Sequence, residues 1–305
     1  MTATHAIGVD LGGTKILAGV VARDGSVLRR HKRETPHDSQ DSVVHELEAA
    51  VTELLSDEIA AVGFGAPSPI DQRRGVVVEC VNLPLKDFAL RDWMSGRLGL
   101  PVGLDNDANA ASIGEWRAGA GRGVQNLVML TLGTGLGGGV IANGRPFRGS
   151  TGAGAELGHV VVVHDGRPCQ GTCRGRGHLE PYVTGLAATA AAREAFGPAA
   201  DAHRLVRLAN EGDSTARGIL AELGGYLGSG MGSFANIFEP ELIVIGGGFG
   251  IAAWEHVMPR AEEVMRREAL RPMRDTVRVV RGELGTAAGL IGAGFVAFEA
   301  LDAQS

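Results

Sequence analysis

The sequence predicts an α/β protein in which two related halves face each other across a cleft. Apolar, β-branched runs of strand length are repeatedly followed by glycine-rich turns, and glycine accounts for 47 of the 305 residues, about twice its average share. A strand, a Gly-rich turn, a second strand and a hairpin are predicted at residues 5–30 and again at 126–150. Apolar residues at helical spacing dominate the longer second half. Ligands commonly bind in the cleft between such halves.

The first half begins with three short strands and continues with helices between further strands. An Asp24-Gly25 turn joins the second and third strands. The predicted elements are the strands His5–Val9, Ile16–Ala22 and Val27–Arg33, the helix Asp41–Glu58, the strands Ala60–Gly65, Val76–Val81 and Val102–Asp105, and the helix Ala108–Ala118.

The second half repeats the opening pattern and then becomes more helical. The predicted elements are the strands Asn126–Leu132 and Gly139–Ala142, the helices Leu179–Phe196, Thr215–Phe238 and Ala252–Arg267, the strands Leu242–Ile245 and Val277–Val280, and the final helix Thr286–Leu301. Because no Pro- or Ser-rich linker separates the halves, the predicted boundary near residue 118 depends on this restart alone.

Composition and charge argue against several classes of protein. The net charge of -6 does not suit a general nucleic-acid binder. No apolar run approaches the ~20 residues that cross a membrane, and Met1–Val9 lacks the basic and apolar regions of a signal peptide. Three cysteines suit a reducing compartment better than a disulfide framework. We therefore expect a cytoplasmic protein.

Two glycine-rich turns have the composition of phosphate-binding loops. Asp10-Leu11-Gly12-Gly13-Thr14-Lys15 and Leu132–Gly139 each follow a predicted strand. Glycines let consecutive N–H groups point at an anion, and threonine hydroxyls add donors. Tight hairpins without a ligand are the alternative, which the presence of equivalent loops in both halves disfavours. Asp10 would lie beside the phosphates, where a carboxylate can hold Mg²⁺ directly or through water.

Two other phosphate-binding motifs do not fit these turns. Gly133, Gly135 and Gly138 satisfy G-x-G-x-x-G, but that fingerprint must open a helix. Val140-Ile141 followed by Asn-Gly predicts a strand and a hairpin instead. A Walker A loop needs Gly-Lys-Ser/Thr, whereas the order here is Gly-Thr-Lys.

A third glycine turn, Gly246-Gly247-Gly248, follows the strand predicted at Leu242–Ile245. Glycines there would let a flat purine ring approach the backbone. A simple strand-to-helix turn before Ala252 is an almost equally good interpretation.

Polar residues gather where the strand Val102–Asp105 ends and a helix begins. Asp and Asn fill four of five positions there, at Asp105, Asn106, Asp107 and Asn109. Both residue types are good helix N-caps, but one cap is enough, and the surplus indicates a binding site at the carboxyl end of the strand. A carboxylate there can accept a proton from a substrate hydroxyl while Asn side chains bind neighbouring hydroxyls.

Cysteines and histidines later in the chain form a candidate metal site. Cys169-x3-Cys173, His178 and the upstream His159 supply a tetrahedral Cys₂His₂ set. Such a set has no vacant position, so we predict a structural zinc that fastens a loop. Free thiols near unrelated histidines are the alternative. Cys80, within an apolar run, is predicted to be a core residue.

Together these residues resemble the ROK family of bacterial sugar kinases and repressors, particularly its glucokinases, over essentially the whole chain. The most specific parts are the Asp-x-Gly-Gly-Thr-Lys loop, Asn106-Asp107 with Asn109-Ala110, the Gly133–Gly139 loop and Glu156-x-Gly-His159. The family implies the actin-like, ribonuclease-H-type ATPase fold, with two α/β domains around a cleft. The implied domains are residues 1–118, joined by the C-terminal helix at about 286–305, and a larger domain at 119–285 that carries a zinc-bound loop.

The resemblance also implies a role for each matching residue. Asp107 is the implied general base, which accepts the proton of the sugar hydroxyl as the γ-phosphoryl group of ATP is transferred. The implied sugar-binding residues are Gly65, Asn82, Asn106, Asp107, Glu156, His159 and Glu180. The implied residues for ATP with Mg²⁺ are Asp10, Gly12, Gly13, Thr14, Lys15, Thr134, Gly135, Gly246, Gly247 and Gly248. The implied zinc ligands are His159, Cys169, Cys173 and His178, with His159 contacting the metal and the sugar through its two nitrogens.

Two segments depart from the family pattern. The family usually shows Cys-x-Cys-Gly-x-x-Gly-Cys-x-Glu, whereas this chain has Cys-x3-Cys and His178 in place of the last cysteine. Zinc accepts histidine for cysteine, so the site is retained. Ser68 stands where glycine is common.

The expected function is that of a glucokinase, which converts glucose and ATP to glucose 6-phosphate and ADP. An N-acetylglucosamine or N-acetylmannosamine kinase is the alternative, decided by the pocket at C2. A sugar-responsive transcriptional repressor is disfavoured, because Asp10 follows too closely on the N-terminus for a preceding helix-turn-helix. The sequence leaves polyphosphate open as a donor, and we expect a homodimer or homotetramer.

Overall fold

Two five-stranded sheets form the framework of the computed structural model, which describes residues 4–304. The first three residues of the N-terminus and the last residue of the predicted C-terminal range therefore lie outside the described residues. The first sheet has the order β3-β2-β1-β4-β8, with β2 antiparallel to both neighbours and the pairs β1–β4 and β4–β8 parallel. Its strands are β1 (His5–Leu11), β2 (Lys15–Val21), β3 (Val27–Glu34), β4 (Ile59–Ala66) and β8 (Val102–Asn106).

The second sheet repeats the design of the first. Its order is β11-β10-β9-β12-β13, again with an antiparallel hairpin at one side and parallel strands added at the other. Its strands are β9 (Leu127–Leu132), β10 (Leu136–Ala142), β11 (Arg145–Pro146), β12 (Leu242–Gly246) and β13 (Arg278–Arg281). The hairpin β1–β2 thus corresponds to β9–β10, which confirms the recurrence predicted from the sequence.

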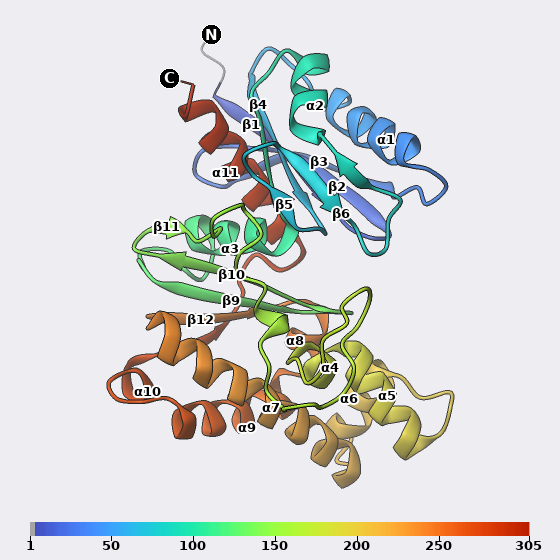
Figure 1. The fold of residues 1–305 in the computed structure, drawn as a ribbon, viewed down its shortest axis with the longest axis vertical. Helices are drawn as coiled ribbons and strands as arrows, with labels where there is room; N and C mark the ends of the chain where they lie inside the picture. The colour runs from blue at the N-terminus through green and yellow to red at the C-terminus, as the bar shows by residue number, and fades with distance from the viewer. Residues whose placement is uncertain (1–3, 305) are drawn as a thin grey trace.

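Helices α3 (Asp107–Ala118) and α11 (Ala288–Asp302) lie between the two sheets, as Figure 1 shows. They pack against each other, α3 also contacts β10, and α11 contacts β1, β4 and β8. The helix α11 comes unusually close to the first sheet because glycines face it. A Cβ atom at Gly8 would lie 2.1 Å from the carbonyl oxygen of Leu290, and one at Gly63 would lie 1.9 Å from that of Ala293.

By length and composition, one segment of the described chain, Gly285–Asp302, is apolar enough to cross a membrane. Half of it is buried inside the protein, and the helix that it contains, α11, packs on the first sheet. This packing accounts for its apolar composition.

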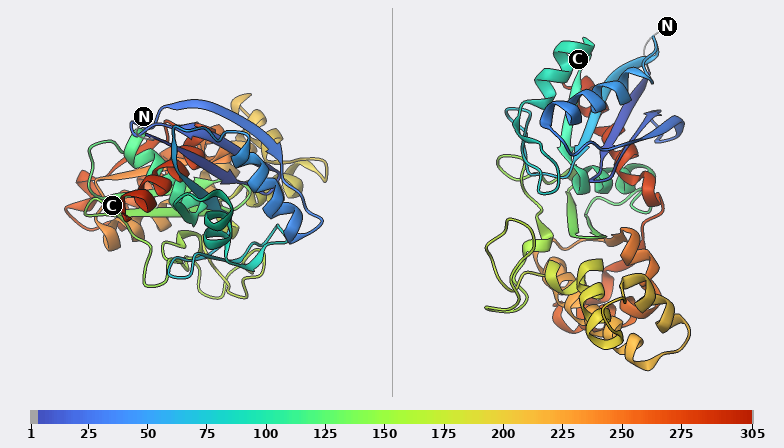
Figure 2. Two further views of the ribbon diagram at one scale, coloured as in Figure 1. Left: turned by 90° about the horizontal axis from the view of Figure 1, so that it is seen from above. Right: turned by 90° about the vertical axis from the view of Figure 1, so that its right-hand side faces the viewer.

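The opposite face of the first sheet is covered by α1 (Gln40–Thr52) and α2 (Leu90–Leu98), which are seen from two further directions in Figure 2. Because side chains alternate along a strand, Ile7 and Val9 join the core under these helices, while Ala6 packs with Ala297 and Phe298 of α11. A small three-stranded sheet flanks this half, with the strands β5 (Ile70–Asp71), β6 (Val76–Glu79) and β7 (Lys86–Phe88).

The remaining helices lie on the far side of the second sheet (Figure 1). They are α4 (Glu180–Val183), α5 (Gly185–Phe196), α6 (Ala202–Asn210), α7 (Ser214–Phe238), α8 (Gly248–Ala252), α9 (Trp254–Glu268) and α10 (Met273–Thr276). Leu220, Leu227 and Met231 of α7 are fully buried in the core that these helices share with the sheet.

Several predicted boundaries are wrong, and each has a local cause. The helix predicted over Asp41–Glu58 ends at Thr52, where turn hydrogen bonds from Leu54 to Val51 and from Leu55 to Thr52 replace the helical pattern. The helix predicted over Leu179–Phe196 breaks at Thr184, whose hydroxyl caps α5 by accepting from the backbone N–H of Ala187.

Other elements also differ from the predictions. The strand predicted over Val76–Val81 ends at Glu79, and the one predicted over Gly139–Ala142 begins earlier, at Leu136. The helix predicted over Ala252–Arg267 is interrupted at Ala253, between α8 and α9. The helices α2 and α6 were not predicted, since each is only nine residues long and shows too few turns for a clear period.

Candidate active site

The side chain of Asp107 lies at the junction of β8 and α3, the first residue of the helix. Its neighbour Asn106 is the N-cap, and the Asn106 amide oxygen accepts from the backbone N–H groups of Ala108 at 2.9 Å and Asn109 at 3.1 Å. The Asn106 amide nitrogen donates to the carbonyl oxygen of Ser68 at 3.3 Å. Capping by Asn106 leaves the Asp107 carboxyl group half-buried and facing the cleft.

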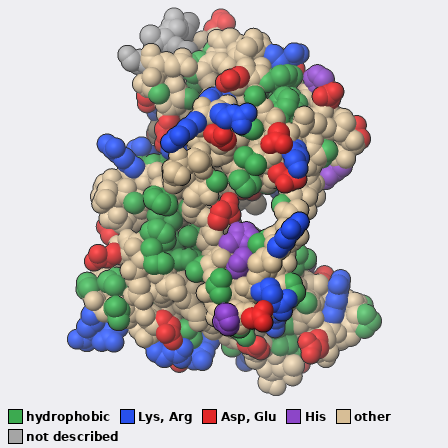
Figure 3. Space-filling model, viewed as in Figure 1, with side chains coloured by type: hydrophobic (Ala, Val, Ile, Leu, Met, Phe, Trp, Pro, Cys, Tyr) green, Lys and Arg blue, Asp and Glu red, His purple; other side chains and the backbone are tan. Residues whose placement is uncertain are grey.

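Asp107 lines two adjoining cavities. The larger, about 560 Å³, is also lined by the predicted site residues Asn82, Thr134, Gly135, His159 and Glu180. The other, about 470 Å³, is also lined by Asp10, Gly246, Gly247 and Gly248. Figure 3 shows the surface indented between the two halves, with acidic and histidine side chains beside the indentation. The predicted sugar side and the predicted nucleotide side therefore meet at Asp107.

The electrostatics of the cleft favour protonated carboxyl groups. Burial, together with the negative charges of Asp10 and Glu156, raises the pKa of Asp107 to about 7, against the lowering effect of the backbone N–H of Ala108. Burial also raises the pKa of Asp10 to about 6, against the lowering effect of Lys15. The pKa of Glu156 is raised by burial as well. A carboxyl group with a pKa near neutrality is suited to accept a proton during catalysis.

Four of the predicted phosphate-binding residues lie where β1 turns into β2: Gly12, Gly13 and Thr14 form the turn, and Lys15 begins β2. The backbone N–H of Gly12 donates to the carbonyl oxygen of Lys15 at 3.0 Å. The hydroxyl of Thr35 donates to the carbonyl oxygen of Gly12 at 2.8 Å. None of the four lines either of the two cavities. Gly65 also lies outside their lining, in β4 between Asp10 of β1 and Asp105 of β8.

The second glycine loop is held by a carboxylate from another element. The Glu180 side chain accepts from the backbone N–H of Leu136 at 3.0 Å, and the N–H of Gly185 donates to the carbonyl oxygen of Gly133 at 2.8 Å. One oxygen of Glu180, predicted as a sugar ligand, is therefore occupied in supporting this loop.

The third glycine turn is both a strand-to-helix turn and part of a cavity wall. The helix α8 begins at Gly248, as the simpler interpretation of the sequence expects. Gly247 has a φ of 82°, and a Cβ atom there would lie 2.3 Å from the carbonyl oxygen of Leu132. Glycine is therefore required at this close crossing of β9.

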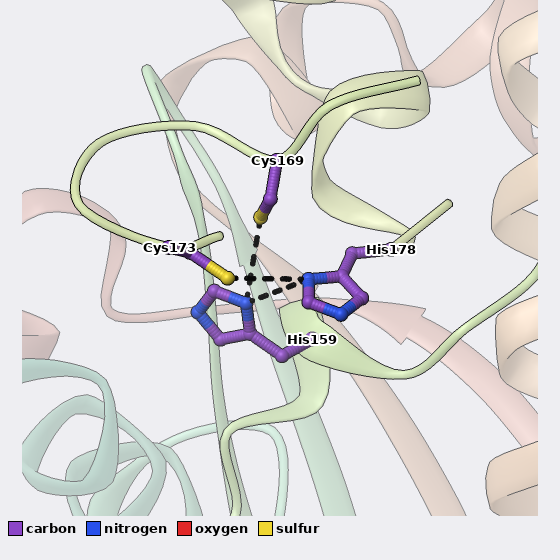
Figure 4. A group of neighbouring side chains, drawn as sticks. All are labelled: His159, Cys169, Cys173 and His178. Carbon is purple, nitrogen blue, oxygen red and sulfur yellow. Dashed lines mark hydrogen bonds between the residues drawn. The ribbon is translucent and has the colours of Figure 1, made fainter. Parts of the chain in front are cut away.

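His159, Cys169, Cys173 and His178 come together in one cluster (Figure 4). Their ligand atoms lie within 4.8 Å of one another. The Nδ1 atoms of the two histidines are 3.1 Å apart, and Cys169 Sγ lies 3.5 Å from His159 Nδ1. Tetrahedral bonds of zinc to nitrogen and sulfur put such atoms about 3.3 to 3.8 Å apart. The 3.5 Å separation lies in this range and the 3.1 Å separation just below it, so the residue types and their approximate spacing fit the predicted metal.

Some residues of the larger cavity were not predicted. Thr131, Gln170 and Thr172 line it beside the expected residues. Their places in the sequence could have indicated them as site residues. Thr131 is the second residue before Gly133, and Gln170 and Thr172 lie between the two cysteines of the cluster.

Each of the two sheets begins with an antiparallel hairpin, and glycine turns and carboxyl groups face the cleft between the sheets. This arrangement defines the actin-like class of α/β ATPase folds. The model of the ROK family matches residues 6–300, and the chain belongs to this family. A glucokinase of Streptomyces coelicolor is 35% identical over 313 residues, which cover 96% of this chain and 97% of that protein.

Solved structures agree with this assignment. The crystal structure of a ROK family glucokinase from Streptomyces griseus, in complex with glucose and AMPPNP, has a TM-score of 0.83 and 35% identity, and covers 97% of this chain and 99% of that one. A ROK hexokinase from Thermus thermophilus has a TM-score of 0.85 and 35% identity, and covers 99% of this chain and 100% of that one. The predicted actin-like fold is therefore confirmed.

Proposed function

We propose that this protein is an ATP-dependent hexose kinase, a glucokinase that converts glucose and ATP to glucose 6-phosphate and ADP. The observation that carries the proposal is that Asp107, with a pKa raised to about 7, lines the predicted sugar-side cavity and the predicted nucleotide-side cavity at once. A base in that position can reach an acceptor hydroxyl on one side and a phosphoryl group on the other.

On the sugar side, Asp107 accepts the proton of the 6-hydroxyl as that oxygen attacks the γ-phosphorus. Asn82, Glu156, His159 and Glu180 bind the other hydroxyls, with Gly65 and Asn106 beside them. The two helix-capping bonds of Asn106 support this role, because they fix the backbone from which Asp107 projects. Positioning of this kind supplies much of the rate in phosphoryl transfer.

On the nucleotide side, backbone N–H groups of the two glycine loops bind the phosphates, and Gly246–Gly248 adjoin the adenosine. The loop residues are Gly12, Gly13, Thr14, Lys15, Thr134 and Gly135. Asp10 offers the oxygen donors that Mg²⁺ prefers, and Mg²⁺ bound with ATP would neutralise charge on the phosphates. Asp10 faces the cavity that Asp107 also lines, which supports this assignment.

In the proposed zinc site, His159, Cys169, Cys173 and His178 hold a structural zinc, which fastens the loop between Cys169 and His178. The Nδ1 atom of His159 belongs to the ligand cluster, so its Nε2 is free to bind a sugar hydroxyl. Coordination would then fix the orientation of the imidazole ring that contacts the substrate.

ATP is the proposed donor in preference to polyphosphate. A polyphosphate chain would need a run of free basic side chains, and the basic run Arg29–Arg33 lies on the outer strand β3. Arg33 pairs with Glu46 and Glu53, and His31 also lies beside Glu53, so acidic side chains offset part of this charge.

We also propose the domain division, location and assembly expected from the sequence. Contacts of α11 with β1, β4 and β8 support joining the C-terminal helix to the N-terminal domain of residues 1–118, with 119–285 as the other domain. Free cysteines at Cys80, Cys169 and Cys173 support a cytoplasmic location. The exposed side chains of Phe147 and Ile237 support a homodimer or homotetramer.

A coupled kinase assay on the purified full chain tests the function. Glucose, mannose, N-acetylglucosamine and N-acetylmannosamine serve as acceptors, each with ATP·Mg²⁺ and with polyphosphate as donor. We expect the highest kcat/KM for glucose with ATP. A higher value for an amino sugar would replace glucose as the substrate, and no turnover of any hexose would overturn the proposal.

A further inference from the structure

We propose that Arg148 is a positioning residue, which sets the distance between the segment that carries Glu156 and His159 and the strand β8, which leads directly into Asp107. The inference rests on the proposed function, because Glu156 and His159 are assigned there to the sugar and Asp107 to proton transfer. Arg148 itself does not line either of the two cavities that Asp107 lines.

The guanidinium group of Arg148 joins three parts of the chain that are far apart in sequence. Arg148 follows β11 of the second sheet. Its Nε donates to Asp105 Oδ2 at 2.6 Å, and its Nη2 donates to Glu299 Oε2 at 2.7 Å. Asp105 belongs to β8 and Glu299 to α11, so one side chain from the second half binds two carboxylates that pack in the first.

This contact is buried, and it adjoins the proposed base. The Asp105 side chain is fully buried, while the Arg148 side chain is 24% exposed. Burial raises the pKa of Asp105, and the charge of Arg148 opposes that effect. Asp105 precedes Asp107 by two residues at the end of β8. A shift of the Arg148 contact would therefore be transmitted directly to the backbone that holds the base.

The same segment docks on the first half at a second point. The backbone N–H of Gln72 donates to the carbonyl oxygen of Thr151 at 2.8 Å. The side-chain amide nitrogen of Gln72 donates to the carbonyl oxygen of Leu104 at 2.7 Å. Gly152 has a φ of 112°, and a Cβ atom there would lie 2.3 Å from Gln72 Cγ. Only a few residues further on lie Glu156 and His159.

Arginine is needed for this arrangement because its planar fork presents separate N–H groups to the two carboxylates. A lysine ammonium group at the same place would bind one of them well and the other poorly. The geometry therefore couples the sugar-side segment to β8 through Asp105 and to α11 through Glu299.

The test compares four variants of the full chain with the wild type: R148M, R148K, the double variant R148M/D105N, and R145M. Arg145 is exposed on β11, so R145M is the matched control for loss of an arginine near the same segment. The measurements are kcat and KM for hexose and for ATP, hexose affinity by calorimetry, and the midpoint of urea unfolding.

We expect R148M to lower kcat/KM for hexose by about 10- to 100-fold, the effect of a displacement of about 1 Å at a reacting centre, while KM for ATP changes little. R148K should recover part of the loss, and R145M should match the wild type. The double variant removes the unpaired buried carboxylate, so it should regain unfolding stability but not hexose kcat/KM.

The outcomes separate this inference from the proposed function. A wild-type chain that neither binds nor phosphorylates a hexose would overturn the function. An active wild type whose hexose kcat/KM is unchanged in R148M would overturn only the inference. Recovery of hexose kcat/KM together with stability in the double variant would also overturn it, since Arg148 would then serve solely to neutralise Asp105. Should R148M fail to fold, R148K and the double variant decide between these results.

Discussion

The carboxyl group of Asp10 on β1 raises the pKa of Asp107 on α3, and both side chains line the same cavity. The two residues come from different elements, so the effect exists only once the first sheet and α3 have packed together. Burial makes the larger contribution, and Asp10 and Glu156 add to it. The fold thus produces a carboxyl group that changes its charge near neutral pH.

Replacing Asp107 by asparagine should abolish proton transfer but preserve the shape of the site. We expect D107N to lower kcat by about 10²- to 10⁴-fold, the usual contribution of a general base, with hexose affinity changed little. Steady-state kinetics and calorimetry check the two parts. Because folding raises the pKa of Asp107 from its ordinary value of 3.8 to about 7, the stability of the fold falls as the pH rises between these two values, and the full loss is present at pH 8. The midpoint of urea unfolding of D107N at pH 8 should therefore equal or exceed that of the wild type. Near-normal turnover would contradict the assignment.

The rate should depend on pH in a direction that the pKa of Asp107 sets. A general base must be deprotonated, so kcat/KM should fall as the pH drops through about 7, the raised pKa of Asp107. The D10N variant loses the charge that contributes to this shift, so the midpoint of its residual activity should lie at lower pH. A pH–rate profile between about pH 5 and 9, with the coupling enzymes in excess, measures both midpoints. A profile flat down to pH 5 would exclude Asp107 as the base.

The zinc content of the protein should depend on the side chains of the four cluster residues. We expect the purified protein to contain zinc, C173S and H178A to lose most of it, and H178C to keep it, since thiolate is also a good zinc ligand. Elemental analysis measures the metal directly. Loss should also raise KM for hexose, because His159 would no longer be held in one orientation. C80A is the matched control for zinc content, because Cys80 is a buried cysteine that is not one of the four cluster residues. A zinc-free wild type with full activity would remove the proposal.

Local sequence patterns predicted the parts of the site that are themselves local. The glycine loops and the Cys-x3-Cys spacing are contained within short segments, and the structure brings the four predicted cluster residues together. The pattern around Asn106 and Asp107 was ambiguous, since any of four polar residues could cap α3. The structure gives that task to Asn106, which neither its residue type nor its spacing could decide.

Contacts between residues far apart in the sequence could not be predicted from local sequence patterns. Arg148 and Glu299 are 151 residues apart, and nothing in the segment around Arg148 indicates two carboxylate partners. Glu115 is a second example. Its carboxylate is buried within α3 and accepts from the backbone N–H groups of Ala120, Glu283 and Leu284, so it ties together the two connections that run between the halves. Such partners are defined only by the packing of α3 and α11 between the sheets.

Close packing of α11 on the first sheet should make Gly63 intolerant of any side chain. A Cβ atom there would lie 1.9 Å from the carbonyl oxygen of Ala293 and 2.7 Å from the backbone nitrogen of Ala297. Both are backbone atoms of a helix, so they cannot turn aside, and α11 would have to move away from β4. We expect G63A to lower the free energy of unfolding by about 3 kcal/mol or more, as overpacking of a rigid core does.

Gly96 provides the matched control for this substitution. It lies exposed within α2, and a Cβ atom there meets nothing within 4 Å. Alanine has a higher helix propensity than glycine, so G96A should stabilise the protein by about 0.5–1 kcal/mol. Urea denaturation of the two variants beside the wild type measures both effects. Equal stability of G63A and G96A would mean that α11 is not held against the sheet as closely as these contacts require, and the joining of the C-terminal helix to the N-terminal domain would lose its support.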